Sequence, residues 1–113
     1  MNAVQTTHGL AFEVSDHFSV IGLDDGYGWK GFRIGTCEGL WSGKGNAYHI
    51  LAVQNKEPHN GHLNDVFEWF EHSCKRDGRP LRVLEVGNPV LARILLKRGF
   101  IPEFGSNNFT KFF

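Results

Sequence analysis

The sequence predicts an α+β fold in which a mostly antiparallel central sheet carries two main helices in the C-terminal half. Three observations lead to this prediction. Short apolar runs alternate with glycine-rich turn clusters before residue 60, and no helical period appears there. Two later segments place apolar residues at helical spacing. A short apolar run, residues 81–86, separates these two segments and reads as a buried strand.

The sequence of residues 1–52 predicts a β-meander whose strands are separated by glycine-containing turns. Strands are expected at 10–14, 18–23 and 31–36, while residues 38–41 either extend the third strand or begin a new one. Glycine and polar residues at 24–28 and 42–46 suit turns, because they tolerate the backbone angles that turns require. Residues 47–54 then form the strand that leads into a polar loop.

The first helix is expected at residues 62–76. Its apolar residues fall on one face of a 3.6-residue period: Leu63, Val66, Phe67, Phe70 and Cys74. Asn60 is the expected N-cap, and Gly78 follows a basic last turn. This face should pack against the sheet.

The second helix is expected at residues 89–98. Asn88 is a good N-cap, and Pro89 suits the first helical position. The predicted buried stripe consists of Val90, Leu91, Ile94 and Leu95. Gly99 is the expected left-handed terminator.

Residues 101–113 predict a closing β-hairpin around the turn at 105–108. We expect the terminal pair Phe112–Phe113 to join the core rather than to serve as a recognition tag. The whole chain, residues 1–113, is long enough for one domain with a modest core.

Composition limits the classes of function. Lys+Arg and Asp+Glu both number 12, so the formal net charge is zero, which argues against non-specific nucleic-acid binding. We expect no membrane span and no signal segment, and therefore a cytoplasmic protein. Cys37 and Cys74 lack metal-ligand spacing and are expected to be reduced core thiols.

Residues 53–100 resemble the GNAT N-acyltransferase superfamily. The shared pattern is a strand ending in valine, a glycine-containing loop, a helix, a glycine turn, a strand, an asparagine, a short helix and Lys-x-Gly-Phe. It falls on Val53, Gly61, Gly78, Asn88, Lys97, Gly99 and Phe100. The resemblance implies a GNAT-like fold trimmed of its early helices, with residues 53–100 as the acyl-CoA core and 101–113 as the closing hairpin.

The resemblance also implies a function. The protein would transfer an acetyl group from acetyl-CoA to an amine, with acetyl-CoA held between the strands that end at Val53 and Val86. The residues expected at the acetyl-CoA site are Val53, Gln54, Asn60, Gly61, His62, Leu63 and Asn88. Backbone N–H groups at a helix N-terminus can hold phosphates.

The chain also departs from the family pattern. The loop's usual basic residue is Pro58, its second small residue is Leu63, and the tyrosine often used as general acid is Leu95. These changes favour an alternative: a catalytically inactive GNAT-fold interaction or inhibitor protein, similar to small phage-encoded GNAT-like proteins, serving as an anti-defence factor or virion component. Its partner would be another protein, with Trp69 as a candidate anchor.

The candidate general bases are His49 and, more weakly, Glu38. His49 lies on the strand before the loop, and imidazole titrates in the right range. Its neighbour Tyr48 should point to the opposite face of the sheet. His49 and Tyr48 are more commonly structural at such positions. His59 and His62 lack a third ligand nearby, so we expect no metal site.

Overall fold

The computed structural model describes residues 6–14 and 28–113, which form a seven-stranded sheet and two helices. The elements are β1 (Phe12–Val14), β2 (Lys30–Ile34), β3 (Cys37–Ser42), β4 (Tyr48–Asn55), α1 (His62–Asp77), β5 (Leu81–Leu84), α2 (Pro89–Lys97), β6 (Ile101–Pro102) and β7 (Phe109–Lys111). The strand order is β1-β2-β3-β4-β5-β7-β6. Only the β4–β5 neighbours among these strands run parallel. The predicted α+β class with a mostly antiparallel sheet is confirmed.

The structure decides how the N-terminal meander is divided. Residues 38–41 belong to a new strand, because β2 and β3 form a tight hairpin in which Ile34 pairs with Cys37. The strand predicted at 18–23 lies outside the described residues. The strand predicted at 10–14 is present as the shorter β1, which pairs with β2.

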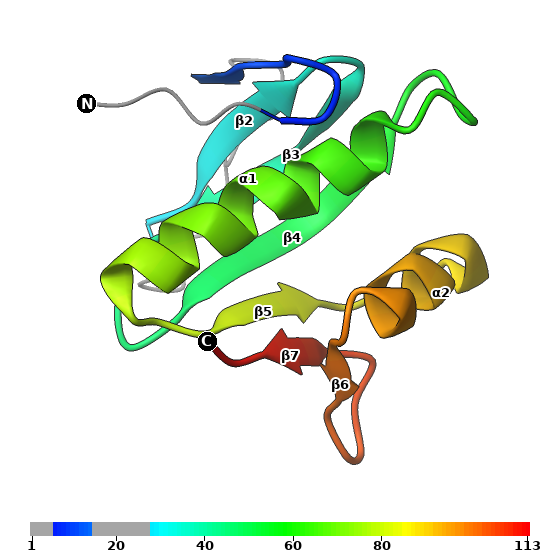
Figure 1. The fold of residues 1–113 in the computed structure, drawn as a ribbon. Helices are drawn as coiled ribbons and strands as arrows, with labels where there is room; N and C mark the ends of the chain where they lie inside the picture. The colour runs from blue at the N-terminus through cyan, green and yellow to red at the C-terminus, as the bar shows by residue number, and fades with distance from the viewer. Residues whose placement is uncertain (1–5, 15–27) are drawn as a thin grey trace.

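Helix α1 lies across one face of the sheet (Figure 1). Its predicted face is largely buried, and Val66, Phe67 and Phe70 are fully covered. The predicted N-cap is wrong. Gly61 occupies that position with φ 81, and the Asn60 carboxamide accepts a hydrogen bond from the His62 amide at 3.0 Å. Glycine adopts this left-handed conformation without steric cost, which explains the shift.

Helix α2 lies beyond the end of β5, beside the first turns of α1 (Figure 1). Asn88 caps it as predicted, accepting from the Val90 amide at 2.8 Å, and Gly99 has the expected positive φ of 89. The predicted stripe is only half buried, since Val90 is 56% exposed. The side of α2 that meets the core carries Leu91 and Leu95. The adjoining side of the helix remains partly open.

The closing hairpin is present as the antiparallel β6–β7 pair. The expectation that the terminal phenylalanines join the core is wrong, because Phe112 is 68% and Phe113 41% exposed. Strand β7 ends at Lys111, whose ammonium group binds Glu71 of α1 at 2.7 Å. Neither helix in the described part of the chain combines the length and apolarity needed to cross a membrane.

Candidate functional site: a groove where β4 and β5 diverge

The two parallel strands pair over only part of their length. Pairing runs from Tyr48 opposite Leu81 to Leu51 opposite Leu84. Strand β5 ends there, whereas β4 continues to Asn55 and stays paired with β3 on its other side. The second half of β4 therefore has one edge that is not covered by β5.

A bulge in β4 begins at this point. Leu40 of β3 lies opposite Leu51, whereas Glu38 lies opposite Gln54, so β4 contains one extra residue. Ala52 takes up the extra length with a positive φ of 58. A bulge bends its strand and commonly re-aims backbone near a binding site. Here it directs the end of β4 away from β5.

The chain also turns sharply just after β5. Glu85 has a positive φ of 54. Its amide donates to the Asn108 side chain at 2.9 Å, and the Val86 amide donates to the Asn107 carbonyl at 2.8 Å. The segment after β5 therefore follows the β6–β7 loop instead of β4. Two left-handed residues, one after each paired segment, separate the two strands.

The divergence opens a groove of about 720 Å³. The end of β4, the following loop, the first turn of α1 and the first two turns of α2 line it. These residues are Val53, Gln54, Asn55, Pro58, His59, Gly61, Leu63, Asn64, Asn88, Val90, Leu91 and Ile94. The lining is mainly aliphatic with several carboxamides, and His59 is its titratable side chain. Such a surface suits a neutral ligand with a few polar groups.

The predicted acetyl-CoA residues divide into two groups. Val53, Gln54, Gly61, Leu63 and Asn88 line the groove. The other two predicted residues, Asn60 and His62, are absent from the lining and instead hold the loop in place.

That loop is held by a polar network behind the groove. The Thr36 hydroxyl donates to Asn55 Oδ1 at 2.7 Å, and the Asn55 amide donates to Asn60 Oδ1 at 2.9 Å. The Thr36 backbone N–H and the Asn60 amide both approach His62 Nδ1, at 3.2 Å each. These contacts make Nδ1 an acceptor and place the ring proton on Nε2. The network fixes the course of residues 56–61.

Neither predicted base lies in the groove. His49 is 6% exposed, and its Nε2 lies 3.2 Å from the Arg82 guanidinium. Burial, assisted by the charge of Arg82, lowers the pKa of His49, so its imidazole is held neutral. Glu38 is 4% exposed and binds Lys56 at 3.1 Å. Tyr48 bonds to Asp77 of α1, which confirms that Tyr48 and His49 face opposite sides of the sheet.

The two thiols are structural. Burial raises the pKa of both Cys37 and Cys74 to about 12, so neither supplies a thiolate near neutral pH. The described residues contain no cluster of His, Cys, Asp and Glu suited to a metal ion.

Sequence reasoning missed part of the groove. Besides Pro58 and His59, which lie in the loop already considered for phosphate binding, the lining residues that it did not assign to the site are Asn55, Asn64, Val90, Leu91 and Ile94. The width of the apolar stripe on α2 was a usable signal. Val90, Leu91, Ile94 and Leu95 span two adjoining sides of a nine-residue helix, and a helix at the end of a sheet buries only one of them.

Comparisons with protein families, curated proteins and solved structures find no match to this chain.

Proposed function

We propose that the protein is a GNAT-like N-acetyltransferase and that the groove holds the acyl-pantetheine end of acetyl-CoA. The divergence of β4 and β5 is the observation that carries this proposal. Past Leu51, β4 presents an edge to the groove that β5 does not cover. Backbone N–H and C=O groups on such an edge can pair with the amides of an extended ligand.

The proposed reaction is attack of an amine nitrogen on the thioester carbonyl carbon. A C–N bond forms, the C–S bond breaks, and the thiolate of CoA leaves and takes up a proton. The amine proton passes to water, because His49 and Glu38 are both buried away from the groove. Catalysis then depends mainly on positioning the thioester against the amine.

The test is a calorimetric titration with acetyl-CoA, together with an assay of thiol release in the presence of amines. Val90→Trp places a large side chain at the groove wall and should weaken acetyl-CoA binding at least about tenfold, because it competes for the ligand's volume. Leu96→Trp is the matched control. Leu96 is 53% exposed on the same helix, close to the 56% of Val90, but lies outside the lining.

The second candidate function is a GNAT-fold interaction protein without catalysis. Phe104 favours it, because this side chain is fully exposed in the β6–β7 loop. Trp69, the anchor predicted from the sequence, is only partly exposed, and its ring stacks on Phe12 at 4.3 Å, so Phe104 is the better candidate. Absence of heat and of thiol release with millimolar acetyl-CoA would remove the acetyltransferase proposal and leave Phe104 as the first residue to vary.

A further inference from the structure

We infer that this groove recognises its acyl donor through the neutral pantetheine arm, almost independently of the nucleotide. The substrate class is then acyl thioesters of pantetheine in general, with acetyl-CoA as one member. This inference rests on the proposed function and specifies which part of the donor provides the affinity.

The groove matches the arm in chemistry. Four residues with carboxamide side chains belong to its lining, Gln54, Asn55, Asn64 and Asn88, among aliphatic side chains. The Asn55 carboxamide is already bonded to Thr36 and Asn60, which leaves the other three as candidate partners for a ligand. The arm itself is an extended chain with two amides joined by apolar carbons. Amide groups satisfy one another's donors and acceptors without placing a charge in the groove.

Asn88 is the best-defined of these carboxamides. Its Oδ1 accepts from the Val90 and Leu91 amides, at 2.8 and 3.4 Å, and so caps α2. The same bonds fix the orientation of the side chain. They direct the oxygen to the helix and leave the N–H₂ group as the donor for a ligand.

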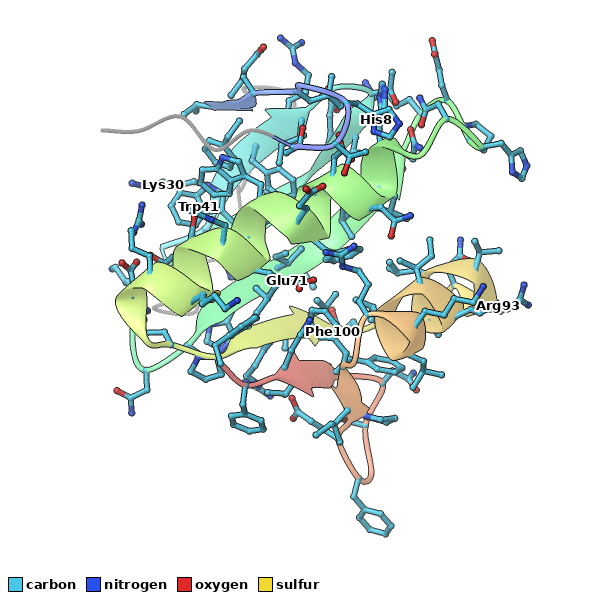
Figure 2. All side chains as sticks on the ribbon, viewed as in Figure 1. His8, Lys30, Trp41, Glu71, Arg93 and Phe100 are labelled. Carbon is cyan, nitrogen blue, oxygen red and sulfur yellow. The ribbon has the colours of Figure 1, made fainter. Side chains whose placement is uncertain are left out.

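The N-terminus of α1 is already balanced by an acidic group. Asp65 lies in the first turn and is 1% exposed, and it binds His8 at 2.9 Å. A carboxylate there offsets the positive end of the helix dipole. His8 also lies at the N-terminal end of α1 (Figure 2), so close that a Cβ on Gly61 would meet its ring at 2.9 Å. A phosphate at this end gains little from the helix.

The lysine and arginine side chains around the groove either form ion pairs with carboxylates or lie away from the groove. Lys56 binds Glu38 at 3.1 Å, and Arg98 binds Glu71 at 2.6 Å. Two further cations belong to α2: Arg93 and Lys97. Arg93 reaches away from α1 (Figure 2). Lys97 lies in the last turn of α2, at the opposite end of the helix from Asn88. Within the described residues, no lysine or arginine lines the groove.

The test compares three donors by calorimetry: acetyl-CoA, 3′-dephospho-acetyl-CoA and S-acetylpantetheine. The titrations are run near pH 8, well above the ordinary pKa of a free imidazole. We expect the three Kd values to agree within about fivefold and to stay constant between about 50 and 300 mM NaCl, since screening weakens only charge-based binding. A preference for acetyl-CoA of more than about fivefold, or a loss of affinity with salt, overturns the inference while the proposed function stands. No binding by any donor overturns both.

A substitution gives an independent readout. Asn88→Asp keeps the cap of α2 but replaces the N–H₂ donor with an acceptor. This substitution should weaken the binding of all three donors by the same factor, about fivefold or more. Asn46→Asp, in an exposed turn outside the lining, is the charge-matched control, and thermal unfolding verifies that both variants fold. A loss confined to the two phosphate-bearing donors would indicate charge repulsion and overturn the inference.

Discussion

The β4–β5 pair has a closed half and an open half, and the contrast between them explains the site. In the closed half, Ile50, Leu81 and Val83 are at most 1% exposed, beneath α1. At the open half, Val53 of β4 is only partly buried and borders the groove, as does Ile94 of the neighbouring helix α2. Apolar residues border both halves, supplied by the strands themselves in the closed half and largely by α1 and α2 around the open half. Hydrophobicity therefore does not distinguish them.

Backbone geometry makes the difference. Ala52 and Glu85 both adopt left-handed conformations at the point of divergence. Such conformations cost non-glycine residues roughly 1–2 kcal/mol each, and strained residues gather at functional sites. The well-packed closed half supplies the stability that offsets this strain. A comparison of variants in the two halves tests whether the closed half provides the stability and the point of divergence carries the strain.

The largest effect is expected in the closed half. Phe67→Ala removes a fully buried ring and should lower the free energy of unfolding by about 3–5 kcal/mol, through lost transfer energy and cavity formation. Leu63→Ala, one helical turn earlier at the groove, should cost roughly 1–2 kcal/mol, because Leu63 is already partly exposed. Urea denaturation measures both variants. Equal losses would show that the two halves do not differ in packing.

A smaller effect of opposite sign is expected at the bulge. Ala52→Gly should raise the free energy of unfolding by about 0.5–1 kcal/mol, because glycine accepts a φ of 58 without the penalty of a Cβ. The matched control is Ala47→Gly, at a buried position just before the paired part of β4, which should destabilise by about 1 kcal/mol. Thermal unfolding distinguishes the two. Destabilisation by Ala52→Gly would contradict the assignment of strain to this residue.

The smallest effect is expected in the pH dependence of stability, through His49 in the closed half. The pKa of His49 is lowered in the folded state, so the unfolded chain binds more protons in the acidic range. The stability contributed by the neutral ring is complete above the ordinary pKa of 6.5 and is lost progressively as pH falls from there towards the lowered pKa of the folded state. The melting temperature should therefore fall less between about pH 7.5 and 5.5 in His49→Gln than in the wild type. His72→Gln, at an exposed position of α1, is the control, and an identical decline in both variants would contradict this role.

Local patterns in the sequence determined both helices and their C-terminal ends. The apolar spacing of α1, the Asn88 cap and the left-handed Gly99 each depend on neighbours within one or two turns of the chain. The closing hairpin was also predictable, although the exposure of Phe112 was not. That exposure depends on where the last strand ends against the rest of the sheet.

The tertiary structure alone decided the groove. The bulge at Ala52 is defined by the register of β4 against β3, and the turn at Glu85 is held by a side chain from the distant β6–β7 loop. The apolar residues Val90 and Ile94 look like core residues in the sequence, and only the position of α2 at the end of the sheet exposes them to the groove. A slip of one residue in strand register reverses every side chain that follows, and no local pattern records that choice.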